Sequence, residues 1–238
     1  MRGFFVSPQR AIAPTRIPAS ALKRKGFQLT LSRKTPPAEF IRRNLRLAPL
    51  AAIPEISLYL AHGGSGLSRL DPDGGTAPYW AFAWGGGLAL ARHVLDHLGT
   101  VAGRRVLDLG AGSGLVGIAA MKAGAAAVLA AETDGYGQAA LHLNAAANGV
   151  TLTPVALDIA ADAPPPVDLV LAGDVFYAPE IARDMLAFLD RCCAAGIDVL
   201  IGDPERRDLP RDRLRRIAEY PVGDMGATGT VSGVYELA

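Results

Sequence analysis

The sequence contains few cysteines and lacks a long uninterrupted apolar run. Only two of its 238 residues are cysteines, and Cys192 and Cys193 are adjacent, which fits neither a disulfide framework nor a metal-binding knuckle. This usage favours a reducing compartment, and we expect a cytoplasmic location. No run of about 18 uncharged apolar residues is present, so we expect no membrane span. The four histidines are scattered, so we expect no metal site.

Acidic residues are missing from the first 38 positions, which hold eight Lys or Arg residues. The remainder holds 16 basic and 23 acidic residues and carries a net charge of −7. An acidic body argues against a nucleic-acid partner, because phosphate binding needs clustered Lys and Arg. We interpret residues 1–38 as a basic, disordered extension and residues 39–238 as one domain. A targeting segment for the mitochondrial matrix and an RNA-binding tail remain alternatives for the extension.

Short apolar segments alternate with helical patterns from about residue 78 onward. Strands are expected at 104–110, 126–132, 151–158, 167–174 and 197–203, with helices within 78–98, 114–124, 135–149 and 179–196. This order predicts an α/β fold with a doubly wound, mostly parallel, seven-stranded Rossmann-like sheet. Residues 39–60 are expected to form a short extended or helical entry segment. Residues 213–222 and 229–238 are expected to supply a helix and two closing strands.

An acidic residue stands at the end of every expected strand. These residues are Asp108, Glu132, Asp158, Asp174 and Asp203. Ligands of open parallel sheets bind beyond the carboxyl ends of the strands, where the strand order reverses. Asp is also a common turn residue, but its recurrence after five strands indicates one polar rim.

The loop "VLDLGAGSGLVG" contains the dinucleotide pattern G-x-G-x-x-G at Gly112, Gly114 and Gly117. It also reads as D-x-G-x-G-x-G from Asp108. A carboxylate two residues before the first glycine would oppose a pyrophosphate at the helix N-terminus. The sulfonium and ammonium of S-adenosylmethionine (SAM) suit a carboxylate rim. We therefore expect SAM, with a nicotinamide cofactor or no cofactor as alternatives.

The second and third strands supply the expected contacts to the nucleoside. Glu132 follows Gly110 by 22 residues and can accept hydrogen bonds from both ribose hydroxyls, with Asp134 as the nearby competitor. Asp158 can accept a hydrogen bond from the adenine amino group. We include Asp108 and Ala172, on two strands that end at this edge, among the expected cofactor-binding residues.

Five segments together resemble the seven-β-strand SAM-dependent lysine methyltransferases that modify the β-subunit of electron-transfer flavoprotein. These segments are "PYWAFAWGGGLALARHVLD", "VLDLGAGSGLVGIAAMKAGAAAVLAAE", "LNAAANGV", "LVLAGDVFY" and "IGDPERRDLP". The resemblance spans roughly residues 36–237. It implies that Trp84 lines the methionine end of SAM, that Gly110 and Gly112 form the cofactor loop, and that Glu132 binds ribose.

The same resemblance implies catalytic roles for Asp174 and Tyr177, which match an Asp-x-x-Tyr motif beside the acceptor lysine. Asp174 would orient the amine, and Tyr177 would line its channel or hydrogen-bond it. The sequence departs from the family at Glu132, where Asp is usual, and at Glu205, where Gly is usual.

Other acceptors remain open at this point. Asp-x-Phe-Tyr is similar to the Asp-Pro-Pro-Tyr loop of adenine amino-methyltransferases, but Val175 and Phe176 replace the prolines that help to hold a flipped base. A ribosomal protein or a small amine such as nicotinamide is an alternative substrate. A non-catalytic SAM-binding partner protein is an alternative of another class.

Overall fold

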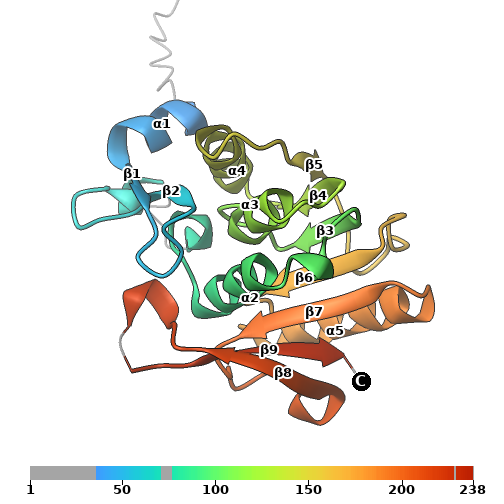
Figure 1. Ribbon diagram of the computed structural model, residues 1–238. Coiled ribbons are helices and arrows are strands. Elements are labelled where there is room, and N and C mark those ends of the chain that lie inside the picture. The colour runs from blue at the N-terminus through green and yellow to red at the C-terminus, as the bar shows by residue number, and fades with distance from the viewer. Residues whose placement is uncertain (1–35, 71–76, 228, 238) are drawn as a thin grey trace, which may run out of the picture. The chain divides into compact units, whose positions relative to one another are not determined.

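Seven strands form one sheet in the order β5-β4-β3-β6-β7-β9-β8 (Figure 1). The computed structural model describes residues 36–70, 77–227 and 229–237, so most of the proposed extension lies outside the described residues. The parallel strands are β3 (Arg105–Leu109), β4 (Ala127–Ala131), β5 (Thr153–Val155), β6 (Leu169–Gly173) and β7 (Asp198–Asp203). Strands β8 (Leu214–Tyr220) and β9 (Ser232–Leu237) pair antiparallel. The expected doubly wound, mostly parallel sheet is confirmed.

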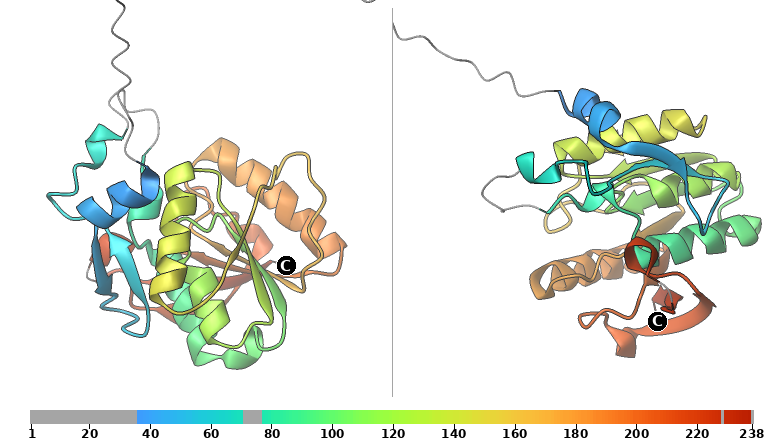
Figure 2. Two further views of the ribbon diagram at one scale, coloured as in Figure 1. Left: turned by 90° about the horizontal axis from the view of Figure 1, so that it is seen from above. Right: turned by 90° about the vertical axis from the view of Figure 1, so that its left-hand side faces the viewer.

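Helices cover both faces of the sheet (Figure 2). The helices α2 (Gly85–Asp96), α3 (Leu115–Lys122) and α4 (Gly135–Ala147) share one apolar cluster with one face. The helix α5 (Pro179–Ala194) packs on the other face through Phe188 and Leu189. Its first turn begins with Pro179 and Glu180, where a missing N–H is harmless and negative charge is favourable.

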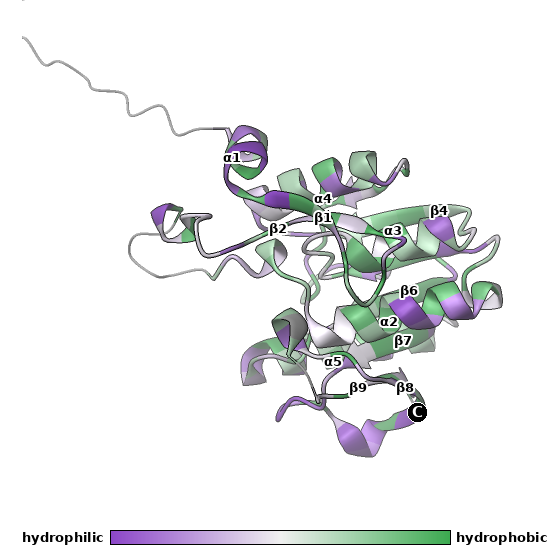
Figure 3. Ribbon diagram, turned by 60° about the vertical axis from the view of Figure 1, so that its left-hand side comes forward, coloured by the Kyte–Doolittle hydropathy of each residue, from purple (hydrophilic) through white to green (hydrophobic). Residues whose placement is uncertain are grey.

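Successive residues of a strand face opposite sides of the sheet. In β6, Leu169 and Leu171 face the cluster with α2, whereas Val170 and Ala172 face α5. Because both faces are covered, the central strands are apolar almost throughout, as the hydrophobic colour of β6 and β7 shows (Figure 3).

The strand order reverses at β3. From β3 the chain moves outward through β4 and β5, and then returns to pair β6 with the other side of β3. A crevice at the carboxyl ends of β3 and β6 follows from this reversal. It brings the loop after β3 next to Asp174, which directly follows β6.

The expected entry segment contains a helix and a hairpin. Helix α1 (Pro37–Asn44) is followed by the antiparallel strands β1 (Arg46–Pro49) and β2 (Ser57–Leu60). Asn144 of α4 and Asn148, which directly follows this helix, hold β2. Asn144 Oδ1 accepts the Tyr59 N–H at 2.8 Å, and Asn148 Oδ1 accepts the Ser57 N–H at 3.0 Å. Asn144 also donates to the carbonyl of Ser113, so one buried amide ties the hairpin to the glycine loop.

Of the helix and two closing strands expected from residues 213–222 and 229–238, the strands are confirmed and the helix is wrong. Residues 214–220 form β8, which pairs antiparallel with β9 and is bulged between Arg216 and Ala218. Local propensity is a weak guide here, because pairing with β9 and packing of Ile217 and Tyr220 decide the conformation.

Helix α2 approaches the sheet closely at two glycines. A Cβ on Gly86 would lie 2.2 Å from the carbonyl oxygen of Gly202 in β7. A Cβ on Gly202 would lie 2.1 Å from the Gly86 oxygen. The start of α2 is therefore set against the end of β7 by direct backbone contact.

Short 3₁₀ turns connect several elements: Leu67–Arg69, Tyr79–Ala81, Leu98–Thr100, Arg211–Arg213 and Asp224–Gly226. Across the described ranges, the helices are all too short or too polar to cross a lipid bilayer.

Candidate active site

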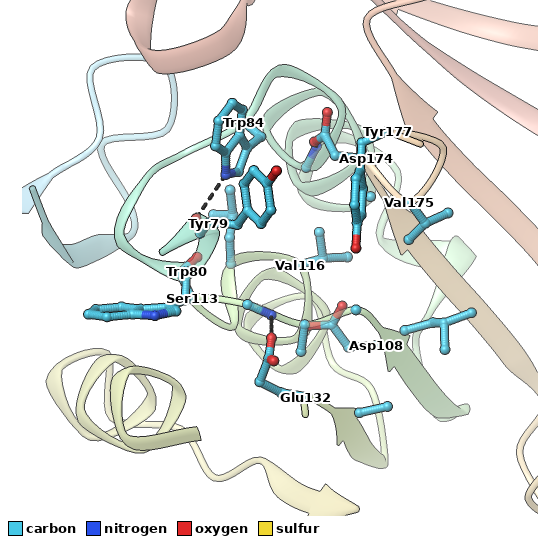
Figure 4. A pocket seen from close by; sticks show the side chains of 18 of the residues that line it. Tyr79, Trp80, Trp84, Asp108, Ser113, Val116, Glu132, Asp174, Val175 and Tyr177 are labelled. Atoms are coloured by element: carbon cyan, nitrogen blue, oxygen red, sulfur yellow. Dashed lines mark hydrogen bonds between the residues drawn. The ribbon is translucent and has the colours of Figure 1, made fainter. Parts of the chain in front are cut away.

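A pocket of about 430 Å³ opens at the carboxyl ends of β3, β4 and β6 (Figure 4). Such a volume is typical of a small-molecule site. The glycine loop (residues 110–114) and Glu132 line one part of its wall, and Trp84, Asp174 and Tyr177 line another. The pocket therefore lies at the place that the reversal of strand order predicts.

The glycine loop is shaped by left-handed backbone. Gly110 has φ 70° and Gly112 has φ 51°, a region that side chains with a Cβ rarely adopt. The loop leads into α3, where the buried carboxylate of Asp108 accepts the Gly117 N–H at 2.8 Å. Burial raises the pKa of Asp108 to about 7.

The contact between Asp108 and Gly117 helps to decide between a dinucleotide and SAM as the cofactor. The first N–H groups of a helix are the place where a dinucleotide's pyrophosphate binds. In α3 a carboxylate of the chain already uses one of them, so the end of this helix is a poor site for a dianion. The loop fits a ligand without phosphate groups, as expected for SAM.

Glu132 links the end of β4 to the glycine loop. Its Oε2 accepts the Gly112 N–H at 2.8 Å, and its Oε1 accepts the Asp134 N–H at 2.7 Å. A carboxylate oxygen has room for a second donor, so the side chain can still receive ribose hydroxyls in the pocket. The competitor Asp134 is engaged elsewhere, because its carboxylate caps α4 at the N–H groups of Tyr136 and Gly137.

Asp174 connects three elements at the opposite wall. Its Oδ2 accepts the Gly87 N–H in the first turn of α2 at 2.6 Å, and its Oδ1 accepts from Arg206 Nη2 at 2.7 Å. Asp224 Oδ1 accepts the Gly85 N–H at 2.8 Å and also receives Arg206 at 3.2 Å. Helix α2 has no cap from its own N-terminal side chain, Trp84. Two carboxylates joined by one guanidinium cap it instead.

The electrostatics of this cluster favour a cationic ligand. Among the residues that the structure describes, the pocket wall contains the carboxyl groups of Asp108, Glu132, Asp134 and Asp174 against one guanidinium, that of Arg206. Burial raises the pKa of Asp174, and the hydrogen bond from Arg206 opposes this shift. Burial also raises the pKa of Tyr177, so its phenol stays neutral at ordinary pH.

Seven of the nine site residues expected from the sequence line this one pocket: Trp84, Asp108, Gly110, Gly112, Glu132, Asp174 and Tyr177. Ala172 does not line it, because its side chain faces α5. Asp158 does not line it either. Strand β5 ends early, at Val155, and the Asp158 carboxylate accepts the Ala160 N–H at 2.9 Å in the turn that follows. Its neighbours Leu157 and Ile159 face the pocket instead.

The polar rim expected from the sequence is thus smaller than five residues. Asp203 is buried beneath the pocket, where its Oδ1 accepts the Arg206 N–H at 2.6 Å. Burial raises its pKa to about 7.

Sequence reasoning missed three residues of this region. Arg206 lies in the quoted segment "IGDPERRDLP", and Tyr79 lies in "PYWAFAWGGG", so the resemblance could have found both. Asp224 lies in the less regular tail and gave no signal of its own.

The fold and the pocket define a Rossmann-like methyltransferase. A family model described as "Lysine methyltransferase" matches residues 81–219. The chain belongs to this lysine methyltransferase family.

Curated relatives agree with the family model. A Xenopus laevis protein named electron transfer flavoprotein beta subunit lysine methyltransferase is 34% identical and aligns over 91% of this chain and 89% of its own length. The rat protein of the same name is 39% identical over 61% of this chain and 59% of its own. The chain thus spans about three-fifths of the rat relative.

Solved structures agree with the fold. A proposed RNA methyltransferase from Pyrococcus horikoshii superposes with a TM-score of 0.50 at 18% identity, over 63% of this chain and 80% of that one. At this identity the likeness concerns the fold alone. SAM is the cofactor that the family and the pocket indicate. Glu132 and the glycine loop line the part of the pocket that would hold its nucleoside.

Proposed function

We propose that this protein is a SAM-dependent protein-lysine N-methyltransferase that acts on the β-subunit of electron-transfer flavoprotein. The observation that carries the proposal is the position of Asp174 and Tyr177. They lie at one wall of the cofactor pocket, on the loop that follows β6. The relatives' names supply the particular substrate.

When bound, SAM supplies a methyl group on a positively charged sulfur, which an amine nitrogen takes while the carbon–sulfur electron pair stays with sulfur. The protein's task is then to align the acceptor and keep its nitrogen neutral. A free lysine has a pKa of about 10.4, and a partly dry pocket lowers the pKa of an amine within it. The guanidinium of Arg206 acts in the same direction, whereas the Asp174 carboxylate paired with it favours the ammonium form and so supports binding of the amine more than its deprotonation.

Asp174 has the role of orienting the amine in this proposal. From the described part of the chain each of its oxygens receives one hydrogen bond, which fixes the carboxylate and leaves a lone pair on each oxygen for the substrate. Its backbone is left-handed, with φ 58°, which is uncommon for a residue with a Cβ and recurs at functional sites. Tyr177 is about half exposed and lines the approach to it.

The test is incubation of the purified protein with labelled SAM and purified electron-transfer flavoprotein, followed by mass spectrometry of the modified peptides. Label on lysines of the β-subunit is expected. Ribosomal proteins, RNA and nicotinamide serve as the competing acceptors in the same experiment. Label on one of these and not on the flavoprotein would replace the proposed substrate, and SAM binding without transfer to any of them would favour a non-catalytic partner protein.

We also propose a cytoplasmic location, on the basis of the cysteine usage. Fractionation of cells that express the full chain tests it. Recovery in an organelle would instead support a targeting role for residues 1–38.

A further inference from the structure

Three aromatic rings meet at the acceptor side of the pocket (Figure 4). The ring of Tyr79 lies between those of Trp84 and Tyr177, with centroid distances of 5.7 Å and 5.3 Å. Tyr79 belongs to the 3₁₀ turn Tyr79–Ala81, Trp84 directly precedes α2, and Tyr177 follows β6. Two separate segments of the chain therefore build one aromatic wall.

The wall is held in place by the backbone. Trp84 Nε1 donates to the carbonyl oxygen of Tyr79 at 2.8 Å, which satisfies the indole N–H and fixes the two residues relative to each other. Tyr79 and Tyr177 are nevertheless 50% and 48% exposed. Trp80 provides the contrast, because it is buried and stacks on Tyr136 at 5.9 Å. Packing accounts for Trp80, whereas Tyr79 and Tyr177 present exposed aromatic surface to a ligand, with the partly buried ring of Trp84 beside them.

The surroundings select the charge of that ligand. Among the described residues of the pocket wall, Glu132, Asp134 and Asp174 face one guanidinium, that of Arg206, and Asp108 adds less negative charge because burial raises its pKa to about 7. Aromatic faces carry negative potential and attract cations that lie within about 6 Å of the ring centroid. The guanidinium of Arg206 already takes this position over Trp84, at 5.7 Å from the ring centroid, so a ligand cation would contact mainly the exposed rings of Tyr79 and Tyr177. Both the rings and the carboxylates therefore favour a cation over a neutral group of equal size.

We propose that Tyr79, Trp84 and Tyr177 form a binding site for an N-methylated ammonium group, with Tyr79 as its central ring. The proposal rests on the proposed function, since the methylated lysine side chain is the cation that the reaction leaves at this wall. Methyl groups make an ammonium larger and more weakly hydrated, so its contact with ring faces improves relative to water. The site thus binds the partly methylated lysine more tightly than the unmethylated one.

The test uses two probes of the same shape. One is Nα-acetyl-Nε-trimethyllysine amide, and the other is its neutral isostere in which a carbon replaces the quaternary nitrogen. Their affinities are measured by calorimetry at two salt concentrations, in the presence of S-adenosylhomocysteine. We expect the cation to bind about three- to tenfold more tightly than the isostere. The preference should persist in Y79F, which keeps the ring, and fall to less than about twofold in Y79L.

Y59L is the matched control, because Tyr59 lies on β2 away from the pocket wall and its loss should leave the preference intact. Equal binding of the two probes to the unmodified protein would overturn the proposal. So would a preference that survives in Y79L and disappears at high salt, since the carboxylates alone would then hold the cation. The assay requires no methyl transfer. Probe discrimination without transfer to any lysine would contradict the proposed function and leave the aromatic site standing.

Discussion

Asp174 and Gly87 are 87 residues apart in the sequence, yet the Asp174 carboxylate accepts the Gly87 N–H at 2.6 Å. The same carboxylate pairs with Arg206 and faces the pocket. One side chain thus caps α2 and forms part of the candidate acceptor site. Substitutions at this position change both stability and activity, and the two effects need different variants to separate them.

The first prediction concerns D174N and D174A. Asn retains an oxygen that can accept the Gly87 N–H but lacks the charge that holds Arg206, whereas Ala loses both. We expect methyl transfer to fall by roughly a hundredfold or more in both variants, because alignment of the acceptor is lost. SAM affinity, measured by calorimetry, should change little in D174N. In D174A alone, the free energy of unfolding should also fall by ~1–3 kcal/mol, the cost of leaving a buried N–H without a hydrogen bond. Turnover retained in D174N would exclude the orienting role.

The second prediction concerns Glu132. Removing its carboxylate in E132A takes away the expected ribose contacts and releases the Gly112 N–H of the loop. Hydrogen bonds to charged groups contribute about 1.5–3 kcal/mol, so the Kd for SAM should rise roughly 10- to 100-fold. E219A, on the exposed face of β8, is the control and should bind SAM normally. An unchanged Kd in E132A would remove Glu132 from the cofactor site.

The third prediction concerns Glu205, which occupies a left-handed conformation with φ 64°. Its side chain pairs with Arg216 at 3.0 Å on the surface. Both E205A and E205G remove this pair, but only Gly removes the backbone strain of about 1–2 kcal/mol. We expect E205G to unfold at a higher temperature than E205A, the reverse of the usual order for these residues. The usual order, with E205A more stable, would show that the loop carries no strain.

The fourth prediction concerns the contact between Gly86 and Gly202. An alanine at position 86 would place its Cβ 2.2 Å from a backbone oxygen, so α2 would have to move away from β7. Overpacking of this kind costs about 1–3 kcal/mol or more, and the displaced start of α2 should also weaken SAM binding. Denaturant unfolding should show a lower free energy of unfolding for G86A. It should show an unchanged one for the control G99A, where the added Cβ meets open space. Equal stability of the two variants would contradict the close approach.

The fifth prediction concerns the pH dependence of stability through Asp108. Its pKa is about 7 in the folded protein and 3.8 in an unperturbed carboxyl. Between these values the folded state binds the extra proton, so this group lowers the free energy of unfolding as pH rises from about 4 to 7. In D108N this side chain does not titrate, so it makes no pH-dependent contribution to the free energy of unfolding. The stability of D108N relative to the unmodified protein should therefore rise by up to about 1.4 kcal/mol per pH unit over that range.

Asp203 has a pKa shifted in the same direction, but it is present in both proteins and cancels in the difference. Chemical unfolding at several pH values measures the effect. A difference between D108N and the unmodified protein that does not change from pH 4 to pH 7 would show that Asp108 titrates normally.

The parallel part of the fold could be predicted because its signals are local. Each of β3, β4, β6 and β7 is a short apolar run that ends in, or is directly followed by, an acidic residue or glycine, and a glycine lies within two residues of the end of α3, α4 and α5. Strand β8 could not be predicted in this way. Its sequence of arginines and alternating apolar residues is compatible with a helix, and only pairing with β9, twelve or more residues later, makes it extended.

The site residues also divide into those that local sequence signals predict and those that depend on long-range contacts. The positions of some site residues at or just after the ends of expected strands predict their role: Gly110, Gly112, Glu132 and Asp174. Asp158 follows a strand too, but that strand ends three residues earlier than expected, so its side chain falls in a turn. Arg206 and Asp224 contribute through long-range pairs with α2 and Asp174, and no local pattern in the sequence indicates such pairs.

The order of the strands also has a consequence for synthesis on the ribosome. A nascent chain that has emerged as far as β7 already contains the glycine loop, Glu132 and Asp174. It still lacks Arg206 and Asp224, which fix Asp174 and the start of α2, and β8 has no partner until β9 follows. The residues that fix Asp174 and the start of α2 are therefore among the last to be made, so the acceptor wall gains its support only after the antiparallel end of the sheet has emerged.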